Sequence, residues 1–183
     1  QEQLLRLAGK NLNIDTVVLR YQNVYGPGQS LSNPYTGILS IFSTRILNGN
    51  DIDIYEDGLE SRDFIYIDDV VDATVKALQS EKSNNQIFNV GSGEATSVIS
   101  VAEKLKELYQ SNINIKVIHK FRLGDIRHNY ADISKINLAL DVTNKISFPE
   151  GLYHFVEWVR DQKINRDNYL ESYKKLENKG LIR

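Results

Sequence analysis

The sequence of 183 residues predicts an α/β fold with at least some parallel strands. Two observations support this prediction. Short apolar or alternating runs, typical of strands, alternate along the chain with amphipathic stretches of helical period. Residues 16–19 (TVVL) are apolar throughout, as expected of a strand that is covered on both faces. With 41% hydrophobic residues, the chain has enough apolar side chains for a sizeable core.

The first half of the chain opens with a helix, predicted over residues 1–10, because Leu4, Leu5 and Ala8 recur at helical spacing and Asn11 suits its end. After the TVVL strand, glycines and prolines in residues 20–34 indicate a long loop. The acidic pair at 68–69 is expected to cap the helix that follows it. The remaining elements expected here are helices over 36–47 and 70–79 and strands over 52–55, 62–67 and 86–90.

The second half continues the alternation and ends in a charged tail. A strand is expected over 115–118 and helices over 97–109, 133–140 and 150–162, with Asp132 capping one helix and Pro149 opening another. Residues 163–183 are rich in charge and are expected to form a peripheral helix or a disordered tail.

Charge and composition exclude several classes of function. The formal net charge of −2 gives no basic field for nucleic acid or anionic membranes, and no apolar run reaches the roughly 20 residues that span a bilayer. The absence of cysteine excludes disulfides, thiolate metal sites and a cysteine nucleophile, and fits a reducing compartment. The three histidines lack metal-ligand spacing. We therefore expect a cytoplasmic protein with no metal site, no nucleic-acid partner and no membrane partner.

The stretch FNVGSGEATS, residues 88–97, resembles the turn that binds the pyrophosphate of a dinucleotide. That motif requires three glycines, and here Gly91 and Gly93 are followed by Thr96 at the third position. The acidic residue expected at the end of the next strand is also missing, since that strand ends in His119 and Lys120. Thr96 and Ser97 suit the capping of the helix that follows, so we interpret the stretch as a capped strand-to-helix turn; cofactor binding over residues 91–96 is the less favoured alternative.

Two polar segments offer side chains that could reach a ligand. Tyr21, Gln22 and Asn23 lie in the segment 20–29 that follows the TVVL strand, where ligands of open α/β sheets bind, although a turn in which Asn23 bonds local backbone fits equally well. Arg62 begins an apolar strand, and its guanidinium suits a phosphate; the alternative is a surface ion pair with Asp63.

A third segment, FRLGDIRHNYAD at 121–132, concentrates charged side chains between a strand and a helix. Arg122 and Arg127 could neutralise a diphosphate, and Asp125 could accept hydrogen bonds from sugar hydroxyls. A solvated charged loop without a ligand is the alternative.

Taken in order, four of these motifs resemble the NAD-dependent nucleotide-sugar epimerase/dehydratase family, the extended short-chain dehydrogenase/reductases. The motifs are LRYQNVYGPGQ, EDGLESRDFIYIDDVVDA, FNVGSGEATSV and GDIRHNYADISK, and the resemblance covers about residues 1–162. The run at 20–42 is most similar to the dTDP-L-rhamnose 4-epimerase-like branch, with UDP-hexose 4-epimerase-like members close to it. The resemblance implies the C-terminal, substrate-binding part of such a protein with the last Rossmann strand or strands.

The resemblance also implies a division of the chain and a missing partner region. Residues 1–30 would end the NAD-binding Rossmann domain, residues 31–162 would bind the nucleotide-sugar with some return to the Rossmann sheet near 62–90, and 163–183 would form the tail. The chain begins at Gln1 and has no methionine. We therefore expect the glycine motif and the catalytic Tyr-x-x-x-Lys pair to lie upstream, with no catalytic residue in this chain. A homodimer is expected for the full-length protein.

Ligand contacts follow from the resemblance position by position. Tyr21 and Gln22 fall where the family lines the nicotinamide end of NAD, although Gln22 replaces an often aromatic residue. Phe64 stands where tyrosine is common, so a hydroxyl contact is lost. The positions that match substrate contacts are Asn23, Arg62 and Arg122 at the diphosphate, Asp125 at the ribose, and Thr36, Gly37, Ile38 and Tyr55 around the base.

The function that the resemblance implies is an NAD-dependent nucleotide-sugar 4-epimerase acting on a dTDP- or UDP-sugar. Such an enzyme removes a hydride from C4 of the sugar and returns it to the other face. The chain alone is expected to be inactive. A fragment of a 4,6-dehydratase and a non-catalytic nucleotide-sugar-binding module remain alternatives.

Overall fold

The structure, a computed structural model, describes residues 1–31, 37–163 and 167–183. Its helices are α1 (Glu2–Leu12), α2 (Ile38–Leu47), α3 (Ile67–Gln79), α4 (Val98–Leu108), α5 (Ser134–Leu140), α6 (Phe148–Arg160) and α7 (Tyr169–Asn178), with a 3-10 turn, η1, at Glu81–Ser83. Its strands are β1 (Val18–Tyr21), β2 (Asn23–Tyr25), β3 (Ile52–Ile54), β4 (Ser61–Arg62), β5 (Phe64–Tyr66), β6 (Ile87–Val90), β7 (Thr96–Ser97), β8 (Ile115–Val117) and β9 (His128–Asn129).

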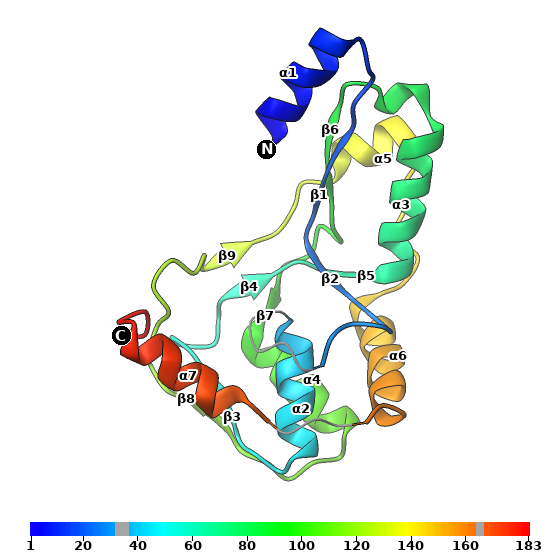
Figure 1. The fold of residues 1–183 in the computed structure, drawn as a ribbon. Helices are drawn as coiled ribbons and strands as arrows, with labels where there is room; N and C mark the ends of the chain where they lie inside the picture. Colours follow the sequence, from blue (N-terminus) through cyan, green and yellow to red (C-terminus); the bar gives the residue numbers. More distant parts are fainter. Residues whose placement is uncertain (32–36, 164–166) are drawn as a thin grey trace.

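The predicted α/β fold with parallel strands is confirmed. β1 pairs with β6, β2 with β5 and β3 with β8, each in parallel. β4 lies between β7, which is antiparallel to it, and β9, which is parallel. Figure 1 shows two lobes: α1, α3 and α5 surround β1 and β6 in one, and α2, α4, α6 and α7 lie in the other.

The segment after the TVVL run differs from its prediction. Residues 20–34 were expected to form one long loop, but β1 continues to Tyr21 and β2 occupies Asn23–Tyr25. β2 forms because Asn23 N donates to Asp63 O and the strand then runs in register with β5. The expectation that the TVVL strand is covered on both faces is also wrong, since its residues are only partly buried.

Helix ends show where local capping signals are reliable. α4 begins after Ser97, whose hydroxyl accepts from Ser100 N, and Asp132 Oδ1 accepts from Ser134 N at the start of α5, both as predicted. The acidic pair at 68–69 is different, because it lies inside the first turn of α3 instead of before it. Asp69 accepts hydrogen bonds from Lys145 N and Ile146 N, which tie the chain before α6 to α3.

Two apolar cores meet at one pair of strands. The core of the α7 lobe contains Tyr25, Phe64 and Tyr66 together with side chains of α2, α4 and α6. The other core contains Ile65, with Val24 packed against it, together with side chains of α3, α5 and β6. β2 and β5 therefore send alternate side chains into the two cores, as the two-residue period of strands requires. Among the described residues, no helix is both long and apolar enough to cross a bilayer.

Candidate functional site

A cavity of about 520 Å³ in the α7 lobe brings together most of the residues that the sequence analysis named. Its walls come from β2, α2, the turn between β3 and β4, β5, the loop after β8, and α7. Segments that are far apart in the sequence thus meet at one place, as the family resemblance requires. The predicted site residues among those lining the cavity are Gln22, Asn23, Gly37, Ile38, Tyr55, Arg62, Phe64, Arg122 and Asp125.

Two predicted site residues are not found in the cavity wall. Tyr21 is 47% exposed, and its hydroxyl hydrogen-bonds Thr74 Oγ1 of α3 at 2.9 Å, because alternate side chains of a strand point to opposite faces. Its neighbour Gln22 lines the cavity instead. Thr36 lies outside the described residues.

Arg62 and Arg122 reach the cavity from separate segments. Arg62 ends β4, and its Nη1 donates to the carbonyl oxygens of Ser61 and Arg127, which fixes the guanidinium at the wall. The alternative of a surface ion pair between Arg62 and Asp63 is wrong, since the Asp63 carboxylate is fully buried and bonded elsewhere. Arg122 pairs with Asp125 at 2.7 Å, with its side chain 42% exposed. Because this ion pair is partly exposed, the Arg122 guanidinium can exchange the Asp125 carboxylate for the phosphate of a ligand.

The apolar part of the wall rests on an aromatic cluster. Phe64 is 5% exposed and packs against Tyr25, edge to face, and against Phe148 at 5.2 Å between ring centroids. Burial raises the pKa of the Tyr55 hydroxyl above its usual value, so Tyr55 stays neutral at physiological pH. The cavity therefore offers flat neutral surfaces beside positive charge, which suits a base linked to phosphates.

Helix α7 covers one side of the cavity, and the sequence analysis missed its role. Tyr169, Ser172, Tyr173 and Leu176 line the cavity at helical spacing. The signal available was this periodic stripe of aromatic and apolar side chains within a tail that otherwise reads as charged and peripheral.

Three contacts hold α7 in place. The guanidinium of Arg45, which is 6% exposed, lies 4.1 Å from the ring centroid of Tyr169. Lys120 Nζ donates to the hydroxyl of Tyr173 at 2.5 Å. After the helix, Phe121 and Arg183 exchange backbone hydrogen bonds of 2.8 and 3.0 Å, beside the loop that carries Arg122. The end of the chain therefore fixes a wall of the site.

We expect Tyr169→Ala to lower the free energy of unfolding by about 1–2 kcal/mol, because a half-buried ring and its cation–π contact with Arg45 are lost. Denaturant titration measures this, and hydrogen exchange should show faster opening of α7. Tyr153→Ala, at a ring that is 52% exposed on α6, is the matched control and should change stability by less than about 0.5 kcal/mol. Unchanged exchange in α7 after Tyr169→Ala would contradict the assigned anchor.

The glycine turn after β6 holds a carboxylate of the protein itself. Asp63 accepts hydrogen bonds from Ser92 N at 2.6 Å, Ser92 Oγ at 2.7 Å, Gly93 N at 3.0 Å and Ala131 N at 3.1 Å. Gly93 has φ +77°, and a side chain at Gly91 would collide with the Asp63 carboxylate. These N–H groups form an anion-binding turn of the kind that holds phosphate elsewhere. Because Asp63 fills it, a dinucleotide pyrophosphate has no place there.

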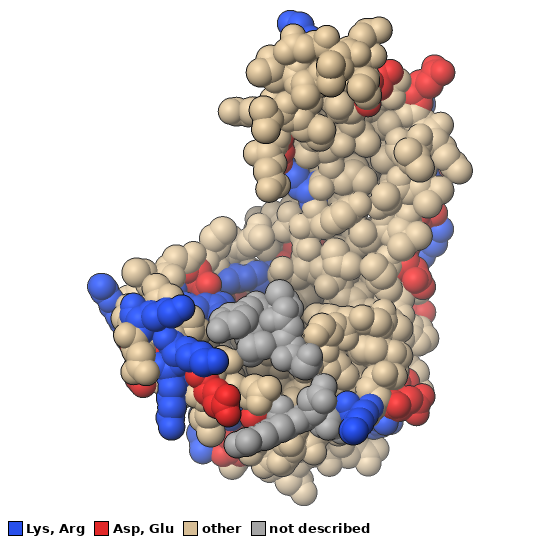
Figure 2. Space-filling view, in the orientation of Figure 1, with Lys and Arg blue, Asp and Glu red and all other residues tan. Residues whose placement is uncertain are grey.

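Charged side chains are unevenly distributed over the molecule. Figure 2 shows Lys and Arg gathered on the lobe that carries α7, while the other lobe presents a mainly uncharged surface in this view. The uncharged surface includes exposed apolar side chains of α1, among them Leu4 at 71% and Leu7 at 58% exposure. The basic side chains seen in this view therefore lie on the lobe that also contains the cavity.

Comparison with known proteins identifies the family. A model of the NAD dependent epimerase/dehydratase family matches residues 1–91. The chain is 39% identical over 168 residues, 92% of its length, to a dTDP-L-rhamnose 4-epimerase of Burkholderia thailandensis, of which it covers 46%. The chain belongs to the NAD-dependent epimerase/dehydratase family. It spans about half the length of the curated members of this family that it matches.

Solved structures of family members agree with this fold. One is UDP-glucose 4-epimerase of Thermotoga maritima with UDP-glucose, at a TM-score of 0.79 and 35% identity, where the match covers 87% of this chain and 50% of that one. Another is UDP-glucuronic acid 4-epimerase of Bacillus cereus with UDP-glucuronic acid and NAD, at a TM-score of 0.78 and 28% identity, covering 87% and 49%. A further curated protein that matches is a UDP-N-acetyl-alpha-D-glucosaminuronate decarboxylase of Bacillus cytotoxicus, 29% identical, where the match covers 87% of this chain and 51% of that one.

Proposed function

We propose that the chain is the nucleotide-sugar-binding portion of an NAD-dependent nucleotide-sugar 4-epimerase, acting on a UDP- or dTDP-sugar. The observation that carries this proposal is the convergence of Arg62 and Arg122 on one cavity that also contains Tyr55 and Asp125. Two guanidinium groups suit the two phosphates of a nucleoside diphosphate, since charge-assisted contacts with phosphate are the strong ones. The ring of Tyr55 suits the base, and Asp125 suits ribose hydroxyls. The 4-epimerases among the matching proteins support the reaction type.

The chain also contributes one side chain that fits NAD. Gln22 lines the cavity, and its buried Oε1 has no hydrogen-bond partner within the described ranges. An amide N–H donor, such as the carboxamide of nicotinamide, would satisfy that oxygen. Gln22 would therefore hold the nicotinamide end of the cofactor. When bound, NAD would accept the hydride from C4 of the sugar and then return it to the opposite face of the same carbon.

The remaining chemistry requires more of the protein than this chain provides. The matched proteins are about twice as long, and the glycine turn at 91–93 is filled by Asp63. We assign the catalytic Tyr-x-x-x-Lys pair and the main NAD-binding turn to the half of the matched proteins that this chain does not cover. The exposed apolar side chains of α1 suit a surface that is covered by that part.

Calorimetry on the purified chain tests the binding role. UDP-glucose and dTDP-glucose are expected to bind, and glucose, which lacks the diphosphate, is expected not to bind. With NAD added, the same chain is expected to show no epimerisation, because we assign the proton-transferring pair to a region that this chain does not match. Absence of binding for both sugar nucleotides at millimolar concentration contradicts the proposed site. Measurable turnover by the chain alone contradicts its assignment as a binding portion only.

A further inference from the structure

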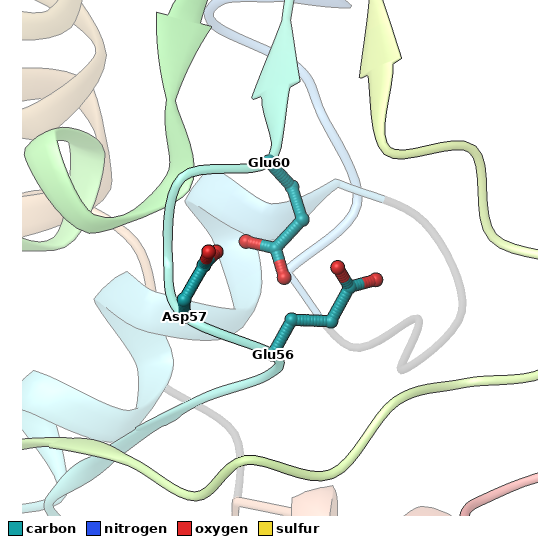
Figure 3. A group of neighbouring side chains, drawn as sticks. All are labelled: Glu56, Asp57 and Glu60. Carbon is teal, nitrogen blue, oxygen red and sulfur yellow. The ribbon is translucent and has the colours of Figure 1, made fainter.

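Three carboxylates meet on the turn between β3 and β4. Glu56, Asp57 and Glu60 bring their carboxylate groups toward one another, and one oxygen from each lies within 4.8 Å of the other two (Figure 3). The turn is fixed in this shape because Glu56 N donates to Lys120 O and Asp57 Oδ1 accepts from Leu59 N at 3.0 Å. We call these three residues the acidic cluster.

Within this acidic cluster, Glu60 differs from its two neighbours. Arg127 pairs with Glu56 at 2.5 Å and with Asp57 at 2.7 Å, so one guanidinium serves both of these carboxylates. Glu60 is 6% exposed, and neither of its carboxylate oxygens has a hydrogen-bond partner among the residues that the structure describes. A buried carboxylate without a partner is costly, and two further carboxylates nearby increase the cost. The cluster thus combines three negative charges with one paired cation.

We propose that the acidic cluster, Glu56, Asp57 and Glu60, binds a divalent cation of the calcium class. Ca²⁺ takes carboxylate oxygens at about 2.3–2.6 Å, so opposite ligands lie about 4.6–5.2 Å apart, which accommodates the spread of the three oxygens. Mg²⁺ dehydrates reluctantly and is usually bound through only one or two carboxylates with several waters, so a group of three protein carboxylates favours Ca²⁺. Glu56 and Asp57 each have lone pairs for both an ion and Arg127.

The burial of Glu60 also favours a small ion over a larger ligand. Its two oxygens are closed to a water molecule, whereas Figure 3 shows the carboxylate directed toward Glu56 and Asp57. A bare cation fits among oxygens at such separations where an organic group does not. Glu56 and Glu60 also line the cavity, so the ion would sit in its wall. The proposal goes beyond the proposed function and does not depend on it, because ion binding is measurable without any nucleotide.

Calorimetry with Ca²⁺ alone, on the chelator-treated chain, tests the site. One equivalent is expected to bind, and Glu60→Gln and Asp57→Asn are each expected to weaken it at least tenfold. Glu94→Gln, at an exposed glutamate outside the cluster, is the matched control and should leave Ca²⁺ binding unchanged. Arg127→Gln should tighten Ca²⁺ binding several-fold, because it removes the positive charge that competes with the ion. Circular dichroism checks that each variant is folded.

A second readout uses Tb³⁺, whose luminescence is excited by a nearby tyrosine; here Tyr55 precedes the cluster directly in sequence. Tb³⁺ emission is expected with the unchanged chain and is expected to be lost in Glu60→Gln. Four results would overturn the proposal: no ion binding to the unchanged chain, binding that survives both cluster variants, binding that arises only in Arg127→Gln, or tighter binding of Mg²⁺ than of Ca²⁺. The third result would mean that the guanidinium alone occupies the cluster.

Discussion

Replacing Asp63 with alanine is expected to lower the free energy of unfolding by about 3 kcal/mol, among the largest effects of a single substitution in this chain. The reason is that its carboxylate, fully buried, accepts four hydrogen bonds from Ser92, Gly93 and Ala131. Alanine leaves those donors without an acceptor and opens a space beside the glycine turn. Urea denaturation followed by circular dichroism measures the change.

Two controls separate the buried carboxylate from charge in general. Ser92→Ala removes one of the four donors and should cost about 1 kcal/mol. Asp68→Ala removes an exposed carboxylate nearby in the sequence and should change stability by less than about 0.5 kcal/mol. If Asp63→Ala costs no more than Asp68→Ala, then the glycine turn does not depend on this carboxylate.

Removing either cavity arginine is expected to weaken UDP binding strongly. Charge-assisted hydrogen bonds contribute about 1.5–3 kcal/mol, so Arg62→Ala and Arg122→Ala should each raise the dissociation constant about 10- to 100-fold. Arg62→Lys keeps the charge but loses the planar fork, and its loss should be smaller. Calorimetry with UDP and dTDP gives the dissociation constants.

Uridine provides the matched ligand for this experiment. It lacks phosphates, so its weaker binding should be the same in the unchanged chain and in both alanine variants. Arg20→Ala, at an arginine that pairs with Glu2 on the other lobe, should leave UDP binding unchanged. Equal UDP affinity in the unchanged chain, Arg62→Ala and Arg122→Ala would remove the diphosphate assignment.

Much of the fold could be predicted because its signals are local. The periodicity of apolar residues predicted helices α1–α6 and strands β1, β3, β6 and β8, and hydroxyl and carboxylate caps at Ser97 and Asp132 marked true helix starts. Strands β2, β7 and β9 were not predicted, and β4 and β5 were predicted as a single strand. Predictions failed where pairing partners lie far away in the sequence. β2 was assigned to a loop because its strand conformation depends on β5, about forty residues later, and not on its own three residues.

For the candidate site, the sequence predicted most of the cavity residues but not those whose role depends on distant contacts. Family motifs named residues that the fold brings to one cavity, including both arginines. The motifs did not predict that Asp63 fills the glycine turn, because its hydrogen-bond partners belong to two other segments. They also did not predict that α7 lines the cavity, because its tyrosines are held there by contacts with Arg45 and Lys120. The acidic cluster could not be predicted, because acidic residues on a turn are usually solvated and the burial of Glu60 arises only in the fold.

The paired strands β2 and β5 limit how this chain can change in length. Val24 and Ile65 face one core while Tyr25 and Phe64 face the other, so both faces of each strand are buried against apolar side chains. One inserted residue in either strand would exchange its two faces, so that each side chain would point into the core packed for the other face. Insertions and deletions in related sequences should therefore avoid these six positions and accumulate in surface loops.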